Sequence, residues 1–167
     1  MKIVFTISQL GGGGAERVVA LLSSKLSELG HDVSLITLYK QEIVSSLNPD
    51  VKLIELNCKK SRVFGSIQQV NSLHKCYVSE NPDVIVSFLP VVNMTAILAK
   101  KGVGCKIIVS ERNDPYQNPR KKVVRVMRDF LYHLSDGFVF QTMDARDYFG
   151  KYAIERGTVI ANPLTGK

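Results

Sequence analysis

Residues 2–17 read KIVFTISQLGGGGAER, an apolar run followed at once by four glycines. The run is rich in β-branched and aromatic residues and predicts a strand over Lys2–Ser8. Apolar residues at helical spacing follow over Ala15–Leu29, and Gly30 is the residue type favoured just past a helix. A glycine loop between a first strand and a first helix favours an anion-binding site, because backbone N–H groups face outward at the helix N-terminus. A flexible turn is the alternative interpretation of the same glycines.

The rest of the chain alternates short β-branched runs with longer helical segments, which is typical of βαβ units. We expect further helices over Ser66–Glu80, Val92–Lys101 and Pro119–Leu134. The further expected strands are Asp32–Tyr39, Val51–Leu56, Asp83–Phe88, Lys106–Ser110, Gly137–Gln141 and Thr158–Ala161. Continuous apolar runs such as Ile107–Val109 indicate strands that helices cover on both faces. The sequence therefore predicts an α/β fold with a Rossmann-like, doubly wound, mostly parallel sheet in one domain over residues 1–167.

Composition and charge narrow the choice of partner. The 167 residues are 45% hydrophobic and 22% charged, as in an ordinary globular domain rather than a disordered or collagen-like chain. The formal net charge of +7 favours an anionic partner such as a phosphorylated ligand, nucleic acid or an anionic leaflet. Nucleic acid is not expected, because the aromatic residues are only 8% of the chain and are not interleaved with the basic clusters.

The cysteines Cys58, Cys76 and Cys105 are widely spaced and form no CxxC pair. Neither a disulfide framework nor a zinc site is expected, and the scattered histidines favour no other metal. We therefore expect a cytoplasmic protein without a metal ion or resident cofactor. Since no stretch of about 18 apolar residues is present, no segment is expected to span a bilayer.

Two common functions of glycine loops are not supported by the neighbouring residues. A dinucleotide-binding fold has an acidic residue at the end of its second strand, whereas this strand ends in Leu38-Tyr39-Lys40. A P-loop continues from its last glycine into lysine and then serine or threonine, whereas this loop continues into Ala15-Glu16-Arg17. Neither a dehydrogenase nor a nucleoside triphosphatase is therefore expected.

An ordered set of motifs resembles glycosyltransferase family 4, whose members have the GT-B fold. Residues 11–38, GGGGAERVVALLSSKLSELGHDVSLITL, are similar to the opening of that family, in which GGAER precedes a G-H-x-V strand. The further similar segments, in chain order, are Val84–Phe88, Val109–Pro115, Ser135–Gly137, Gln141-Thr142 and Val159–Leu164. Together these segments extend the resemblance over nearly the whole chain.

The resemblance implies a retaining transfer of sugar by two Rossmann-like domains that face each other across a cleft. It assigns this chain to the N-terminal, acceptor-side domain, because the family's donor-binding domain and its glutamate motif have no counterpart up to Lys167. It implies a UDP-sugar as co-substrate, with an N-acetylhexosamine such as N-acetylgalactosamine (GalNAc) as the transferred sugar. The expected acceptor is an undecaprenyl-diphosphate-linked glycan in the synthesis of O-antigen, lipopolysaccharide or capsule, at the inner face of the bacterial cytoplasmic membrane. A stand-alone module that binds a phosphorylated ligand or partner without catalysis is the alternative.

The resemblance also assigns roles to the glycine loop. In such transferases the loop faces the donor phosphates, which implies Gly12, Gly13 and Gly14 as phosphate contacts, with Glu16 and Arg17 close behind. The alternative for the last two is a solvated helix start, where an acidic residue such as Glu16 suits the positive end of the helix dipole.

Glu111, Arg112 and Asn113 follow the carboxyl end of a predicted strand, which is where ligands bind in open parallel sheets. We expect the catalytic and acceptor region there. Many members of the family have a histidine at this point, so a histidine-based mechanism is not carried over to Arg112, whose planar guanidinium suits phosphate oxygens. The alternative is an Arg-Glu pair that only orders the loop. Asn93 is a further candidate for the acceptor side, with a helix N-cap as its alternative role.

The helix after Pro119 is strongly amphipathic. Its basic residues, which we expect on one face against an anionic membrane surface and the lipid diphosphate, are Lys121, Lys122, Arg125 and Arg128. Its apolar residues, which we expect to pack on the core, are Val123, Met127, Phe130, Leu131 and Leu134. Near an anionic leaflet each basic residue contributes about 1 kcal/mol, which predicts peripheral attachment without insertion. A solvated helix face is the alternative interpretation.

Overall fold

A computed structural model describes residues 1–40, 47–59 and 67–162 of the chain. The strands in these ranges are β1 (Lys2–Ile7), β2 (Asp32–Thr37), β3 (Lys52–Glu55), β4 (Val84–Phe88), β5 (Lys106–Glu111), β6 (Gly137–Phe140) and β7 (Gly157–Val159). The helices are α1 (Gly14–Glu28), α2 (Ile67–Glu80), α3 (Pro90–Ala99), α4 (Lys122–Tyr132), α5 (Met143–Tyr148) and α6 (Lys151–Arg156). Every expected strand and helix is present with slightly different ends, and the short helices α5 and α6 were not predicted.

The strands form one seven-stranded sheet in the order β3-β2-β1-β4-β5-β6-β7. Every pairing in the described part of the chain is parallel, so the predicted α/β, doubly wound sheet is confirmed. The chain first moves outward from β1 to β3 and then returns to place β4 on the other side of β1. This reversal creates a crevice between the carboxyl ends of β1 and β4, the place where open α/β sheets bind ligands.

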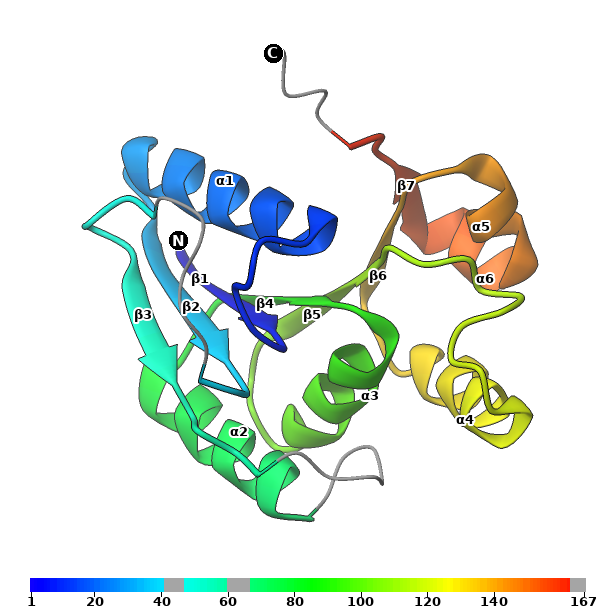
Figure 1. Ribbon diagram of the computed structural model, residues 1–167, viewed down its shortest axis with the longest axis horizontal. Coiled ribbons are helices and arrows are strands. Elements are labelled where there is room, and N and C mark those ends of the chain that lie inside the picture. Colours follow the sequence, from blue (N-terminus) through cyan, green and yellow to red (C-terminus); the bar gives the residue numbers. More distant parts are fainter. Residues whose placement is uncertain (41–46, 60–66, 163–167) are drawn as a thin grey trace.

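Helices cover both faces of the sheet (Figure 1), as the continuous apolar strands predicted. On one face, Phe5 of β1 packs in a cluster with Val19 of α1. On the other face, Val4 belongs to a larger cluster with Leu73 of α2 and Met94 of α3. Neighbouring residues of β1 thus serve opposite layers, and each buried side chain of this size stabilises the fold by about 1.5–3 kcal/mol.

The C-terminus of α1 is fixed by the glycine that the sequence indicated. Gly30 has a φ of +84°, which glycine adopts at little cost. Its N–H donates to the carbonyl of Ser27, and the N–H of His31 donates to the carbonyl of Leu26. This pair of bonds is the Schellman motif, and it turns the chain sharply into β2.

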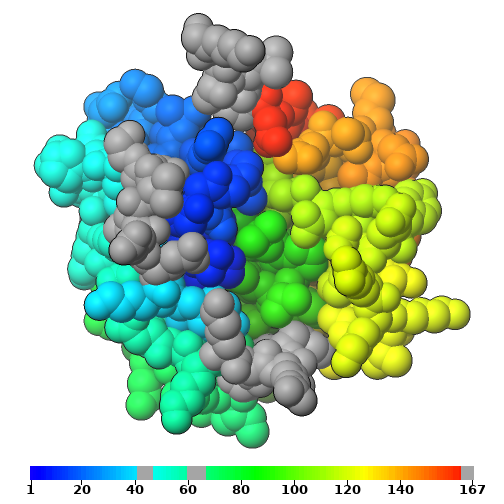
Figure 2. Space-filling view, in the orientation of Figure 1, coloured from blue at the N-terminus to red at the C-terminus, as the bar shows by residue number. Residues whose placement is uncertain are grey.

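Helix α4 packs on the core with a different face from the one expected. Leu131 and Tyr132 are buried, and Arg128 is completely enclosed. Of the five apolar residues that were predicted to pack on the core, only Leu131 does so, and the prediction is wrong for Val123, Met127, Phe130 and Leu134, which are exposed. Val126 is exposed on the same side, and Leu134 lies just past the end of the helix. The prediction failed because a helical pattern shows which residues share a face but not which face turns inward. In Figure 2 the yellow surface of α4 protrudes at the edge of the molecule.

Among the described residues, none of the helices combines the length and apolar character that a bilayer crossing requires. The same ranges contain no cluster of histidine, cysteine and acidic side chains arranged to hold a metal ion.

Candidate functional site

A cavity of about 350 Å³ lies at the crevice between the ends of β1 and β4. It is lined by Gly13, Gly14, Ala15, Glu16, Leu89, Arg112, Asn113, Gln141 and Asn162. The glycine loop after β1 and the Arg112-Asn113 pair after β5 therefore share one cavity, although about a hundred residues separate them in the sequence. Gly12 and Arg17, which the sequence placed in the same group, lie outside this lining.

The glycine loop leads directly into the first turn of α1. The N–H of Arg17 donates to the carbonyl of Gly13 at 3.0 Å, so regular helical bonding begins there. The N–H groups of Gly14, Ala15 and Glu16 precede it in the first turn and have no acceptor within the helix. These amides carry the positive end of the helix dipole and are suited to an anion.

Glu16 has a structural role at this helix start. Its carboxylate is buried and accepts a hydrogen bond from the N–H of Gly13 at 3.0 Å. A negative side chain stabilises a helix N-terminus, but it repels a phosphate. The geometry therefore favours the structural alternative for Glu16 over direct contact with phosphate.

Gly12 and Gly14 differ in whether the fold requires a glycine at their position. Gly12 has a φ of +95°, which other residues adopt only with strain. At Gly14, by contrast, an added Cβ would meet no atom within 4 Å and the backbone φ is ordinary. The fold itself therefore does not require a glycine at position 14. Because Gly14 has no side chain, its backbone is accessible from the cavity.

Arg112 is held at the cavity wall by three neighbours. Its Nε donates to Oγ of Ser110 at 2.7 Å, and its Nη1 donates to Oδ1 of Asn162 at 2.8 Å. The guanidinium also lies over the ring of Phe88, 5.3 Å from the centroid. Partial burial lowers the pKa of Arg112, but an arginine remains charged at neutral pH. These bonds use two of the five N–H groups, so a fixed positive charge with further donors borders the cavity.

Glu111 lies behind the cavity wall, with only 1% of its surface exposed. Its Oε2 accepts a hydrogen bond from the hydroxyl of Tyr132 at 2.8 Å, and its Oε1 accepts one from the N–H of Asn113 at 3.2 Å. Burial raises the pKa of Glu111 to about 7, although the bond from Tyr132 and the charge of Arg128 oppose that shift. These contacts give Glu111 the role of positioning the loop that carries Arg112 and Asn113.

Asn93 belongs to the same buried network. Its Nδ2 donates to the carbonyl of Ser110 at 3.1 Å and to the hydroxyl of Tyr132 at 2.9 Å. The side chain is fully buried, so the prediction that it faces the acceptor is wrong. The alternative role as a helix N-cap is also wrong, because α3 begins at Pro90 and Leu89 occupies the cap position.

The basic residues of α4 do not line any of the cavities described at this edge of the sheet. Lys121 and Lys122 are exposed, whereas Arg125 is half-buried and donates to two carbonyls of the preceding loop. Arg128 was predicted on the exposed basic face, and this prediction is wrong because its guanidinium is enclosed.

Hydrogen-bond acceptors and aromatic rings surround the enclosed guanidinium of Arg128. The guanidinium donates to the carbonyls of Asn118 and Pro115 and pairs with the carboxylate of Asp129. It also lies over the rings of Tyr148 and Phe149. A charged group is buried at tolerable cost only when its donors are satisfied in this way.

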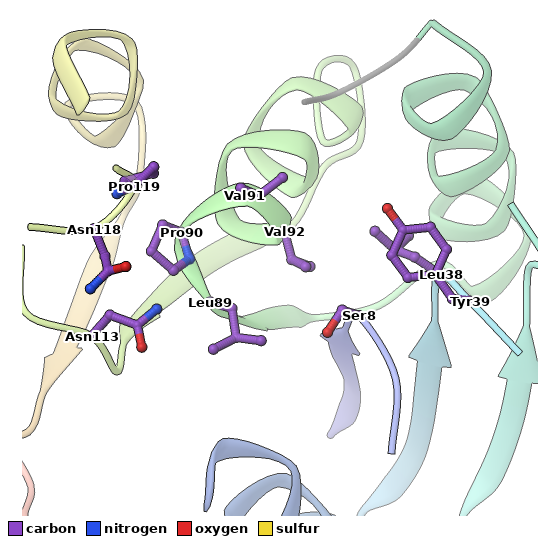
Figure 3. A pocket seen from close by; sticks show the side chains of 10 residues that line it. All are labelled: Ser8, Leu38, Tyr39, Leu89, Pro90, Val91, Val92, Asn113, Asn118 and Pro119. Atoms are coloured by element: carbon purple, nitrogen blue, oxygen red, sulfur yellow. The ribbon is translucent and has the colours of Figure 1, made fainter. Parts of the chain in front are cut away.

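A second cavity of about 350 Å³ adjoins the first and was not predicted from the sequence. It is lined by Ser8, Leu38, Tyr39, Leu89, Pro90, Val91, Val92, Asn113, Asn118 and Pro119. Figure 3 shows the amides of Asn113 and Asn118 at one end, with Ser8, Leu38 and Tyr39 toward the other and apolar side chains between them. The carboxyl ends of β1 and β2 could have indicated this cavity from the sequence, because parallel strands end at the same edge of a sheet.

Leu89 and Asn113 line both cavities and so connect them. Leu89 has a φ of +75° and a ψ of 139°, a conformation that a leucine adopts only with strain. Strain of this kind costs of the order of 1–3 kcal/mol and is concentrated at functional sites. This backbone outlier therefore marks the boundary of the two cavities as a candidate site.

Comparison with known families shows the family of the chain. The family model for a glycosyl transferase 4-like domain matches residues 13–165 of the chain. The chain belongs to this family. It has the fold of one half of a GT-B transferase, and Gly13, Gly14 and Arg112 lie within the matched residues.

The chain is similar to one half of a bacterial glycosyltransferase. The chain is 29% identical to the GalNAc-α-(1→4)-GalNAc-α-(1→3)-diNAcBac-PP-undecaprenol α-1,4-N-acetyl-D-galactosaminyltransferase of Campylobacter jejuni, over 98% of this chain and 46% of that protein. The chain thus spans about half the length of this curated relative.

Solved structures show the same fold at low sequence identity. A lipopolysaccharide outer core galactosyltransferase in its apo form is 15% identical, with a TM-score of 0.71 over 100% of this chain and 47% of that one. A UDP-GlcNAc 2-epimerase from Methanocaldococcus jannaschii is 14% identical, with a TM-score of 0.68 over 97% of this chain and 46% of that one. Because an epimerase shares the architecture with a transferase, the fold alone does not define the reaction.

Proposed function

We propose that this chain is the N-terminal, acceptor-side domain of a retaining glycosyltransferase. The sugar is an N-acetylhexosamine, with GalNAc as the best candidate, and it is transferred from a UDP-sugar to a lipid-linked glycan. The observation that carries the proposal is the cavity shared by the first-turn amides of α1 and the guanidinium of Arg112. The name of the Campylobacter jejuni relative supports the choice of sugar and of an undecaprenyl-linked acceptor.

In this proposal the cavity beside the glycine loop binds the donor diphosphate. Gly13 and Gly14 line it, and the dipole of α1 favours a negative charge there. The Gly13 N–H already donates to Glu16, so we assign the principal backbone contact to Gly14. Arg112 is assigned to the same phosphates, because its planar fork matches phosphate oxygens.

The reaction exchanges one bond at the anomeric carbon of the sugar for another. An acceptor hydroxyl forms the new glycosidic bond as the bond to the diphosphate breaks, and UDP leaves with the electron pair while a proton is released. Negative charge therefore develops on the diphosphate in the transition state. Fixed donors such as Arg112 and the loop amides stabilise that charge without reorganising, and removing one such donor typically costs about 10²–10³ in rate.

The adjoining cavity of Figure 3 is assigned to the acceptor sugar. Its wall is mainly apolar, and Asn113 and Asn118 supply amide groups at one end. An acetamido sugar combines a methyl group with an amide, so it matches this mixture of side chains. Since Asn113 and Leu89 line both cavities, an acceptor in the second lies next to a donor in the first.

We further propose that the protein acts at the cytoplasmic face of the bacterial inner membrane, in the assembly of an O-antigen or related polysaccharide. An undecaprenyl-linked acceptor is embedded in a membrane, and the basic charge of the chain, +7, suits an anionic leaflet.

Sugar transfer by the complete gene product tests the proposal. The protein is incubated with UDP-GalNAc, UDP-GlcNAc, UDP-glucose or GDP-mannose and with undecaprenyl-diphosphate-linked GalNAc-containing glycans, and the products are separated by mass. We expect extension by one N-acetylhexosamine with retained anomeric configuration and release of UDP. Transfer from GDP-mannose alone, epimerisation of the UDP-sugar, or no extension of any lipid-linked acceptor would overturn the proposal.

A further inference from the structure

Helix α4 and the residues just after it carry an outward stripe of apolar side chains. Its side chains recur at helical spacing and are exposed as follows: Val123 71%, Val126 60%, Met127 40%, Phe130 72% and Leu134 61%. Single exposed apolar residues are common, but a contiguous stripe along one helix marks an interaction surface.

The opposite face of α4 holds this stripe outward. Arg128 donates to the carbonyls of Pro115 and Asn118, and Tyr132 donates to Glu111 in the buried network behind the site. Turning the helix to bury Phe130 would expose Tyr132 and break these bonds. The stripe is therefore a surface that the fold maintains.

Charge identifies the kind of partner that the stripe fits. Arg120, Lys121 and Lys122 are exposed where α4 begins, next to the apolar stripe. The acidic residue of α4, Asp129, pairs with Arg128 and accepts a hydrogen bond from the hydroxyl of Tyr148. An apolar helix face bordered by cations is the composition of helices that lie in the interface of an anionic bilayer.

We propose that α4 inserts into the membrane surface, in place of the attachment without insertion that was expected when its apolar residues were predicted to pack on the core. The stripe defined by Val123, Val126, Met127, Phe130 and Leu134 enters the boundary between head groups and acyl chains, while the cations before it contact anionic head groups. The inference deepens the proposed function, since it rests on a membrane-embedded acceptor for its purpose. Pro119, one residue before these cations, lines the cavity assigned to the acceptor, so the inserted helix places that cavity at the membrane surface.

Vesicle binding of the chain, without any sugar, tests the inference. Flotation with phosphatidylcholine vesicles, with and without phosphatidylglycerol, gives the partition coefficient. The double variant Val126→Ser/Phe130→Ser is expected to bind phosphatidylglycerol vesicles at least about tenfold more weakly, because two apolar side chains no longer leave water. The control is Val78→Ser on α2, whose valine is 57% exposed and thus closely matches Val126. This control is expected to change binding by less than about twofold.

The cations are tested separately. Lys121→Gln/Lys122→Gln is expected to weaken binding to phosphatidylglycerol vesicles and to reduce its dependence on salt, while leaving the weak binding to phosphatidylcholine unchanged. The circular dichroism and the Tm of all variants are expected to match those of the parent chain, since every substituted side chain is exposed.

A second measurement covers the case in which a serine variant fails to fold. Spin-labelled lipid in the vesicles is expected to broaden the NMR signals of Phe130 and Val126 in the unaltered chain but not those of Val78. Equal broadening of α2 and α4, or equal binding by parent and double variant, would overturn the inference. So would light scattering that shows a dimer of the parent chain that the double variant lacks, since the stripe would then be covered by a second copy. None of these results depends on sugar transfer, so this inference and the proposed function fail independently.

Discussion

The hydroxyl of Tyr132 donates a hydrogen bond to Oε2 of Glu111 across 2.8 Å, in the interior of the protein. Tyr132 is the last residue of α4, and Glu111 is the last residue of β5. The bond therefore joins the helix with the exposed apolar stripe to the loop that carries Arg112. Through the N–H of Asn113, the same carboxylate fixes that loop from behind.

Removing this hydroxyl is expected to destabilise the fold. In Tyr132→Phe, the carboxylate of Glu111 loses a donor and the amide of Asn93 loses an acceptor, at a cost of about 1–3 kcal/mol. Urea denaturation measures the change. The matched control is Tyr152→Phe, because the buried Tyr152 hydroxyl has no hydrogen-bond partner among the described residues and its removal should cost little. Equal losses in the two variants would contradict the network.

The pH dependence of stability is expected to carry a contribution from Glu111. Burial raises its pKa to about 7 from the ordinary 4.5, so between these values the folded protein holds a proton that the unfolded chain has released. This contribution is fully present below about pH 4.5 and is lost as pH rises through about 7, a change of up to about 3 kcal/mol at 1.36 kcal/mol per pKa unit.

Glu111→Gln removes that titration. The difference in unfolding free energy, parent minus variant, should therefore fall between about pH 4.5 and about pH 7 and then level off. Denaturation series at several pH values measure it. A difference that stays constant across this range would show that the carboxyl group titrates in the usual range, and one that rises with pH would show that folding lowers its pKa. Either result would contradict this prediction.

Arg112→Ala is expected to lower kcat/KM of the complete transferase by on the order of 10², because a fixed donor to the departing diphosphate is lost. Initial-rate kinetics with varied UDP-sugar measure the effect. Arg156→Ala is the control, since Arg156 also donates to a neighbour, the carbonyl of Ser135, and also lies over an aromatic ring, but on α6 outside the cavity lining. Similar rates for both variants would remove Arg112 from the site.

Gly14→Ala separates binding from folding. At Gly14 and at Gly104 an added Cβ would meet no atom within 4 Å, so alanine at either position should stabilise the fold slightly, by about 0.4–1 kcal/mol. Gly14→Ala alone places a methyl group in the cavity and is expected to weaken UDP-sugar binding by about tenfold, as measured by calorimetry. If Gly104→Ala had the same effect on affinity, the assignment of the loop would be wrong.

The features that the sequence predicted well are those that local chemistry and topology determine together. β-branched runs set the strands, and Gly30 ended α1 because its positive φ suits glycine. The approach of Gly14 and Arg112 followed from the parallel order of the strands, since their carboxyl ends meet at one edge.

The features that could not be predicted from the sequence depend on tertiary contacts. The carbonyls of Pro115 and Asn118 enclose Arg128, and nothing in the helical pattern of α4 indicates them. Asn93 was assigned by residue type, but α3 starts at Pro90, and Asn93 is therefore buried against Tyr132. The short helices α5 and α6 have too few residues for apolar periodicity to be visible.

The central claim is that the amide of Gly14 and the guanidinium of Arg112 bind the same diphosphate, and an NMR titration of the chain with UDP tests it most directly. The backbone N–H signal of Gly14 and the Nε–H signal of Arg112 are expected to shift together with a single Kd, and inorganic phosphate should displace UDP from both. The contradicting result is binding of UDP that moves other signals and leaves these two unchanged, or that moves them at clearly different UDP concentrations.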